Sequence, residues 1–308
     1  MSGASIAAGA AQIAGGVALA PLLPGLVQHW KARLQGRRGP TPLQPYRELR
    51  RLWRKTAVDV SGAGAVYRLA PAIAAASVCV AILIVPAASR SPSWGVGHDM
   101  LALAGVLALG RFALAAAAWD VGSGFSLMGA SRDLTLGVFV EVPLVLALGV
   151  AALVAGTTNL VVVAARTAGT VPWSGPGLAL AGLAFGIVVL AETGRQPVDN
   201  PDTHLELTMI HEGPLLEYAG PDLAFLQWAM AARHWLVLVL VATVFLPHPP
   251  GVWWQLAVLP AVLVLLCGAL ALTETLVAKM RILLAPRLLA AGAATALLGI
   301  ASFLVQSR

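Results

Sequence analysis

The sequence predicts an all-α protein that crosses a membrane with about eight helices. Hydrophobic residues make up 58% of the 308 residues and charged residues only 11%, whereas about a quarter of a soluble domain is charged. The chain also contains uncharged stretches of about 20 residues, the length an α-helix needs to cross about 30 Å of hydrocarbon. These stretches are runs of Ala, Leu and Val, which favours helices over the alternating strands of a membrane β-barrel. The same composition excludes a disordered chain.

Four spans are predicted in the first half of the chain. The first 30 residues contain no Asp, Glu, Lys or Arg, and they lack the basic start of a signal peptide. A second span lies in the 21 uncharged residues between Arg68 and Arg90. The third and fourth each enclose a charge, running from about Met100 to Trp119 around Arg111 and from about Leu134 to Gly156 around Glu141.

Four more spans follow. The fifth lies in the 25 uncharged residues between Arg166 and Glu192. The 40 residues from His234 to Thr273 carry no formal charge and are interrupted by Leu246-Pro-His-Pro-Pro-Gly251, which predicts two spans joined by a tight turn. The eighth runs from about Leu288 to Gln306.

The distribution of charge predicts the orientation. Ten of the 20 basic residues lie between Lys31 and Arg68, and basic loops collect on the cytoplasmic side. This places both termini outside and creates two long cytoplasmic loops, a basic one at about 31–67 and an acidic one at about 192–224. The acidic loop holds seven of the 14 acidic residues. No linker divides the chain, so residues 1–308 are expected to form a single integral membrane domain.

Charged residues inside a bilayer cost about 2.5–3.5 kcal/mol each at its centre and therefore point to function. Glu141 admits two interpretations that are compatible with each other: a proton-relay carboxylate, or a helix-packing ion pair with Arg111 of the preceding span. Glu274 lies near the end of a span, where both a solvated position and a place in a proton pathway are open.

The acidic loop concentrates groups that bind protons. Its histidines, His204 and His211, are seven residues apart and do not match the H-E-x-x-H zinc pattern. Neighbouring carboxylates hold and pass protons more readily than isolated ones. The loop supplies six such candidates: Glu192, Asp199, Asp202, Glu206, Glu212 and Glu217.

Redox centres are not expected in this chain. Its two cysteines, Cys79 and Cys267, are far apart in sequence, and an iron–sulfur cluster is usually held by about four cysteine thiolates. Any electron transfer would therefore take place in a partner subunit.

Two motifs resemble the inner loops of the complex I subunit 1 family, which includes the corresponding membrane subunit of bacterial NADH-quinone oxidoreductase. The first is Gln35-Gly-Arg-Arg-Gly-Pro40, followed by the basic Arg50-Arg-Leu-Trp-Arg-Lys55. The second is Glu192-Thr-Gly-Arg-Gln-Pro197 with the residues that follow it up to Gly220. Residues 197–212 are most similar to the branch found in formate hydrogenlyase and hydrogenase-4 type complexes. His204 stands where the quinone-reducing branch typically has a further acid, which favours the hydrogenase branch.

The resemblance implies a multi-pass subunit of a bacterial inner membrane that anchors a peripheral arm. The arm would comprise an iron–sulfur small subunit and a nickel–iron large subunit, with antiporter-like subunits alongside in the bilayer. It would imply no nucleic-acid partner. The docking surface for the arm would comprise Gln35, Arg37, Arg38, Gly39, Pro40, Arg195, His204 and His211. The proton pathway would comprise Glu141, Glu192, Asp199, Asp202, Glu206, Glu212, Glu217 and Glu274.

Other functions remain open at this point. A quinone-reducing complex would use the same loops to hold a quinone headgroup, and some relatives have lost the nickel ligands of the partner subunit. A stand-alone ion or proton transporter would need no docking loop. A membrane scaffold without a proton role would keep the loops but tolerate the loss of Glu141.

Overall fold

The computed structural model describes residues 10, 13–58, 60–86, 97–168, 175–199, 210–247 and 252–306, with the side chains of 252–256 excepted. Within these ranges the chain is helical and contains no β-strand. The α-helices are α2 (Leu22–Leu34), α3 (Gln44–Trp53), α4 (Ala65–Ile84), α5 (Met100–Val121), α6 (Gly124–Ala155), α7 (Leu160–Thr167), α8 (Pro176–Glu192), α9 (Gly220–Val244), α10 (Val252–Leu276) and α11 (Ala285–Gln306), with short 3₁₀ turns η2 (Gly213–Leu215) and η3 (Ile282–Leu284).

Six helical segments of the described residues are long and apolar enough to cross a bilayer: α4, α5, α6, α9, most of α10, and η3 with α11. They agree with six of the predicted spans and make the chain a multi-pass membrane protein. The other two predictions coincide with shorter helices. α8 has 17 residues, and the helix of the first predicted span is interrupted at Ala20 and Pro21 before α2 continues for 13 residues.

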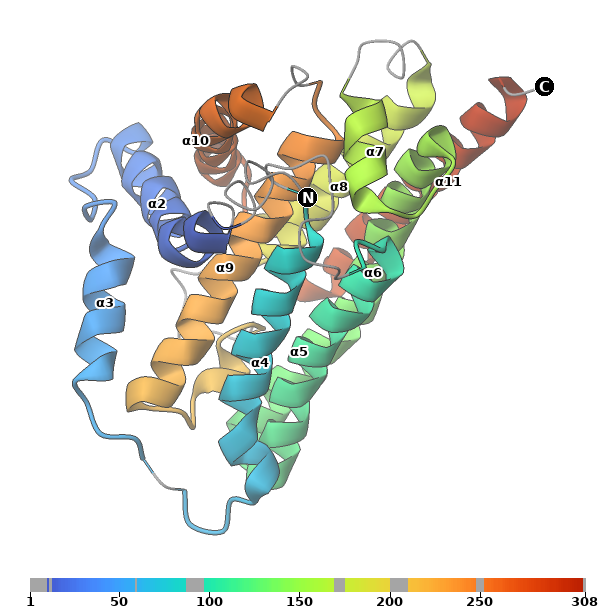
Figure 1. The fold of residues 1–308 in the computed structure, drawn as a ribbon. Coiled ribbons are helices and arrows are strands. Elements are labelled where there is room, and N and C mark those ends of the chain that lie inside the picture. The colour runs from blue at the N-terminus through green and yellow to red at the C-terminus, as the bar shows by residue number, and fades with distance from the viewer. Residues whose placement is uncertain are drawn as a thin grey trace.

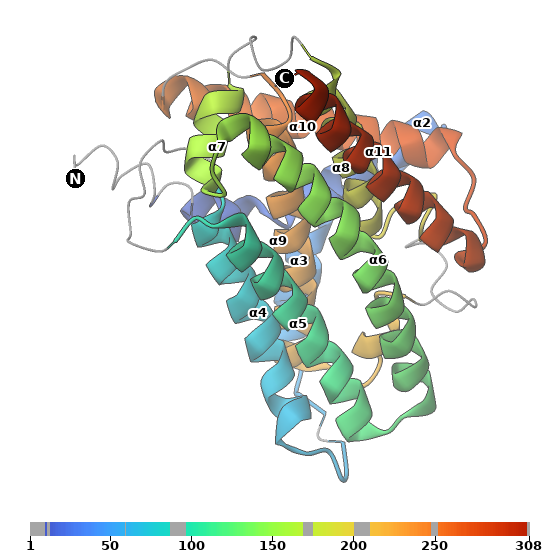
Figure 2. The same ribbon diagram turned by 90° about the vertical axis from the view of Figure 1, so that its right-hand side faces the viewer.

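The helices α4, α5 and α6 run side by side along one flank of the molecule (Figure 2). α6 has 32 residues and begins at Gly124, ten residues before the predicted start of the fourth span. Asp133 is therefore part of a helix rather than of a loop. α6 also packs against α8 and α11.

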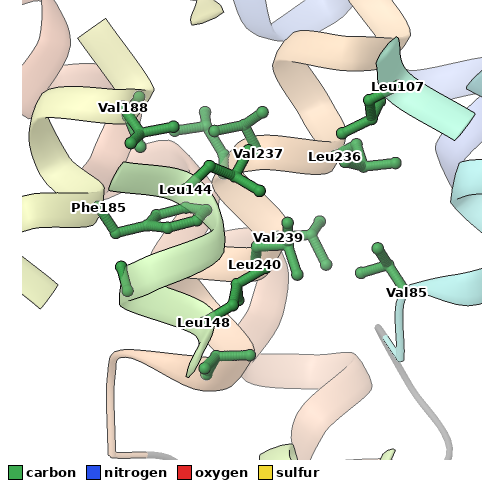
Figure 3. Packing of buried hydrophobic residues seen from close by; sticks show 14 of the residues in the cluster. Val85, Leu107, Leu144, Leu148, Phe185, Val188, Leu236, Val237, Val239 and Leu240 are labelled. Carbon is green, nitrogen blue, oxygen red and sulfur yellow. The ribbon is translucent and has the colours of Figure 1, made fainter. Parts of the chain in front are cut away.

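The apolar core gathers around α9, whose spanning segment is the most deeply buried of the six. Val237 of α9 packs near Leu144 of α6 and Phe185 of α8, and Leu236 lies beside Leu107 of α5 (Figure 3). The rings of Phe185 and Phe245 stack with their centroids 4.8 Å apart. The spanning segments of α10 and α11 are only 28% and 22% buried, which leaves apolar faces for lipid or for neighbouring membrane subunits.

The two predicted inner loops meet at one end of the helix bundle, where α3 connects to α4 and α9 begins (Figure 1). Tyr67 at the start of α4 stacks on Tyr218, with ring centroids 4.4 Å apart. The Tyr67 hydroxyl donates to the carbonyl of Glu217 at 2.7 Å, and the Tyr218 hydroxyl donates to the carbonyl of Tyr67 at 2.9 Å. Gly220 has a φ of +60°, and a Cβ there would lie 2.6 Å from the carbonyl oxygen of Thr56. The basic and acidic loops are therefore on the same side of the molecule.

Candidate functional site: two buried ion-pair clusters beside a cavity

One guanidinium inside the bundle is surrounded by three carboxylates. Arg111 of α5 is 6% exposed. Its Nη1 lies 3.1 Å from Oε1 of Glu141, its Nη2 lies 3.0 Å from Oε1 of Glu192, and its Nε lies 3.7 Å from Oδ2 of Asp133. The predicted ion pair between Arg111 and Glu141 is thus present. This ion pair belongs to a larger group of charged residues that joins α5, α6 and the end of α8.

Two further residues complete this group. Arg233 of α9 lies 2.5 Å from Oε2 of Glu192 through its Nε. Nδ1 of His211, in the acidic loop, lies 3.2 Å from Oδ1 of Asp133. We call the six residues the Arg111 cluster: Arg111, Asp133, Glu141, Glu192, His211 and Arg233. Two arginines and three carboxylates carry a net charge of −1, so the protonated form of His211 brings the cluster to neutrality.

The surroundings of His211 favour its protonated form. Burial alone would lower the pKa of His211, but the hydrogen bond and charge of Asp133, with the charge of Asp199, outweigh it and raise the pKa above its usual 6.5. Gly194 leaves room for the imidazole, because it has a φ of +61° and a Cβ there would lie 2.7 Å from Cδ2 of His211.

We expect the stability of the protein to fall as the pH rises through the folded-state pKa of His211, above about 6.5. A group whose pKa is higher in the folded state stabilises the fold fully below its unfolded pKa, and this contribution is lost when the folded state releases its proton. Thermal unfolding in detergent at about pH 6 and about pH 8.5 measures the effect. His211→Gln should remove this part of the pH dependence, whereas His29→Gln, whose ring faces the carbonyl of Pro40, should retain it. If the melting temperature changed equally between the two pH values in the wild type and in both variants, the expectation would be contradicted.

A glycine of α6 makes room for the Arg111 side chain. A Cβ on Gly137 would lie 2.6 Å from Cδ and Nη1 of Arg111. Because three carboxylates hold the guanidinium, it cannot move aside without losing ion pairs. We therefore expect Gly137→Ala to destabilise the protein by about 1–3 kcal/mol, as overpacking commonly does.

A second glycine of the same helix provides the control. Apart from its chain neighbours and the backbone of its own helix, no atom of the described residues lies within 4 Å of a Cβ built on Gly149. Gly149→Ala should therefore leave the melting temperature unchanged or raise it, because alanine has the higher helix propensity. If both variants melt alike, the crowding at Gly137 is not what limits the stability.

A second group of buried charges surrounds Glu274. The Glu274 side chain of α10 is fully buried, with Oε1 3.1 Å from Nη1 of Arg195 and Oε2 3.5 Å from Nζ of Lys31. Lys31 comes from the last turn of α2, and Arg195 lies three residues after Glu192. We call Lys31, Arg195 and Glu274 the Glu274 cluster. Their three charges sum to +1, opposite in sign to the five fixed charges of the Arg111 cluster.

Most of the Arg111 cluster, together with Arg195 of the Glu274 cluster, lines one cavity of about 660 Å³. Its polar wall includes Arg111, Glu192, Arg195 and Arg233. Apolar residues of α4, α5 and α9 form much of the remaining wall, and the cavity extends to α2 and α3. The site is therefore a partly polar chamber in contact with both clusters and the two inner loops.

The predicted proton-pathway residues that the structure describes separate into three groups. Glu141, Glu192 and Glu274 belong to the clusters, and Asp199 and Glu212 line the cavity. Glu217 lies beside the stacked tyrosines, where its carbonyl accepts the Tyr67 hydrogen bond. Asp202 and Glu206, like the docking candidate His204, lie outside the described residues.

The predicted docking residues lie in two different places, one a continuous segment and the other the buried clusters. Gln35, Arg37, Arg38, Gly39 and Pro40 form one segment between α2 and α3, which we call the docking segment. The side chains of Arg37 and Gln35 hydrogen-bond to each other, and Arg38 is exposed. Arg195 and His211 are instead part of the buried clusters.

Arg111 was predicted only as the packing partner of Glu141, and three further cluster residues were absent from the predicted site: Asp133, Arg233 and Lys31. Each lies directly outside an uncharged stretch that predicted a span. Asp133 precedes the predicted start of the fourth span by one residue, and Arg233 precedes that of the sixth. Their position next to an apolar run could have identified them, because residues within one turn of either end of a span can lie on the same helix.

Comparisons with known proteins agree with the fold. A family model described as NADH dehydrogenase matches residues 9–303. The chain is 34% identical to formate hydrogenlyase subunit 4 of Escherichia coli (strain K12) over 302 residues, covering 93% of this chain and 95% of that protein. It is 36% identical to hydrogenase-4 component C of the same organism over 230 residues, 74% of this chain and 71% of that protein.

A solved structure shares the fold. A chain of the archaeal membrane-bound sulfane sulfur reductase, a respiratory membrane complex, aligns with a TM-score of 0.74 at 22% identity. The alignment covers 95% of this chain and 99% of that one.

Proposed function

Because the chain belongs to the NADH dehydrogenase family of complex I subunit 1 type, we propose that it is the membrane-anchor and proton-pathway subunit of a hydrogenase-4 or formate hydrogenlyase-like complex. In this role it binds a peripheral arm at its inner end and couples the electron transfer of that arm to proton movement. Iron–sulfur clusters and a nickel–iron centre belong to partner subunits. The complex lies in a bacterial inner membrane, with both termini of this chain outside and eight crossings counting α2 and α8.

The observation that carries the proposal is the Arg111 cluster. Buried charges are costly, and a buried ion pair seldom stabilises a fold more than well-packed apolar side chains would. A group of three carboxylates with two arginines is therefore better explained by proton handling than by stability. One proton at His211 changes the net charge of the cluster from −1 to 0. Because His211 belongs to the acidic loop, a change in that loop that alters the protonation of His211 also alters the charge of the cluster.

The acidic loop supplies a physical link to the partner subunits. Glu192 and Arg195 flank one turn after α8, and each belongs to a different cluster. His211 farther along the same loop contacts the first cluster again. A partner that changes the position or potential of this loop would shift charge at both clusters. We infer that this loop transmits the redox state of the arm to the carboxylates.

The docking segment offers a basic surface for the arm. Arg37 and Arg38 are exposed, and the ring of His29 on α2 lies 2.8 Å from the Pro40 carbonyl, so the segment is held against α2. An exposed, ordered pair of arginines suits the acidic surface of a partner protein.

Extraction in a mild detergent tests the proposal. The chain should co-purify with subunits that contain iron and nickel, which metal analysis and mass spectrometry would identify. An Arg37→Glu, Arg38→Glu double variant should lose the arm while retaining the membrane subunits. Arg54→Glu in the same basic loop is the control for a general charge effect. An isolated chain that transports protons alone would overturn the proposal.

The cavity supports a second candidate, a quinone-reducing complex. A volume of about 660 Å³ lies within the range of small-molecule sites, about 300–1,000 Å³. Its wall combines an apolar portion with arginine and histidine donors, which suits a quinone with its isoprenoid tail. A stoichiometric quinone retained by the purified complex would favour this candidate.

A further inference from the structure

One ring nitrogen of a histidine in the cavity wall lacks a hydrogen-bond partner among the described residues. His234 of α9 is 4% exposed, and its Nε2 is buried without a hydrogen bond to any residue that the structure describes. The preceding residue, Arg233, pairs with Glu192 of the Arg111 cluster. Consecutive helical residues point about 100° apart, so His234 faces a different part of the cavity from Arg233.

Arg195 of the Glu274 cluster has a similar unsatisfied atom. Its Nη1 pairs with Glu274, but its Nε is buried and has no hydrogen-bond partner within the described part of the chain. Arg195 and His234 line the same cavity. Two buried polar atoms in one cavity wall thus need a partner that the described residues do not supply.

Water is the partner that fits. A buried polar atom without a hydrogen bond costs about 1–3 kcal/mol, and buried waters usually satisfy such atoms. One water occupies about 30 Å³ in the liquid, so a cavity of about 660 Å³ has room for many. Arg111, Glu192 and Arg233 supply further donors and acceptors along the wall.

We propose that His234 and Arg195 position a chain of water molecules in this cavity, and that the chain carries protons to the Arg111 cluster. His234 acts as a positioning residue: its ring orients a water through Nε2 while Arg195 orients another through Nε. The proton moves along water oxygens to a carboxylate of that cluster, and the ring neither gains nor loses one. This inference rests on the proposed function, because it assigns a route by which protons reach the Arg111 cluster.

Substitutions that keep or remove the polar atom test the proposal in the complete complex. In proteoliposomes, His234→Leu should lower the number of protons translocated per electron by at least about fivefold, with electron transfer changed less than about twofold. His234→Gln, whose amide reaches a similar position, should restore at least about half of the wild-type ratio. Co-purification and melting temperature establish that both variants assemble.

A second buried histidine provides the matched control. His98 also has a buried Nε2 without a hydrogen-bond partner among the described residues, but it lies before α5, where its Nδ1 contacts the carbonyl of Ile84. His98→Leu should leave the ratio of protons to electrons unchanged, whatever it does to stability.

The possible results separate the two proposals. A wild-type ratio in His234→Leu, or an equal loss in the leucine and glutamine variants, would overturn the water chain. A quinone retained by the wild type and displaced in His234→Leu would also overturn it. A wild-type complex that translocates no protons would instead overturn the proposed function itself.

Discussion

Arg111→Met should destabilise the protein by about 3–5 kcal/mol, the range measured when one partner of a buried ion pair is removed. The substitution leaves Asp133, Glu141 and Glu192 in the bundle with only Arg233 and His211 of the cluster to balance them. Because Arg111 joins α5 to both α6 and α8, we expect loss of the assembled subunit from membranes as well as a lower melting temperature in detergent.

A double-mutant cycle shows whether the cost arises from unpaired charge. Arg111→Met combined with Glu141→Gln should be less destabilised than the sum of the two single variants, because the second substitution removes one unpaired carboxylate. Arg111→Lys keeps the charge but lacks the planar guanidinium whose several N–H groups reach three carboxylates. Its stability should therefore lie between that of the wild type and that of Arg111→Met. If Arg111→Met has the same melting temperature as the wild type, the cluster does not hold the helices together.

The length of uncharged runs predicted most of the helices correctly, since a membrane allows few alternatives to an apolar helix. It did not predict α7, which has eight residues and packs beside α6. It also overestimated the length of α8, because the uncharged run from residue 167 includes residues that precede Pro176. Lack of charge marks where a helix is permitted, whereas Pro176 and other local signals determine where it begins.

The candidate site was less predictable for a different physical reason. Arg111 and Glu192 are 81 residues apart in sequence, and no helical periodicity determines which faces of α5 and α8 meet. The sequence did indicate Arg111 and Glu141 as a pair, because two opposite charges in adjacent spans have few other partners. Asp133 and Arg233 looked like ends of spans, and only the packing of α6 and α9 shows that they belong to the same cluster.

Glu192→Gln should reduce proton translocation per electron by at least about tenfold, which is the largest functional effect that we expect from a single carboxylate. The Glu192 side chain is 1% exposed and binds both Arg111 and Arg233. The amide keeps the shape of the carboxylate but neither its charge nor its ability to take up a proton. Measurement of acidification in proteoliposomes, together with the rate of electron transfer in the same preparation, separates coupling from turnover.

Glu141→Gln should have a smaller effect than Glu192→Gln. The Glu141 side chain is 34% exposed and binds one arginine, Arg111, among the described residues, so water or a neighbouring subunit can replace it more easily than the carboxylate between two arginines. Asp99→Asn is the control, because Asp99 caps the start of α5 and asparagine caps helices equally well. If Glu192→Gln translocates protons at the wild-type ratio, this carboxylate does not lie on the proton route. In that case the ion pairs of Glu192 with Arg111 and Arg233 would serve only to hold the helices together. Glu274, in the second cluster, would be the next buried carboxylate to test.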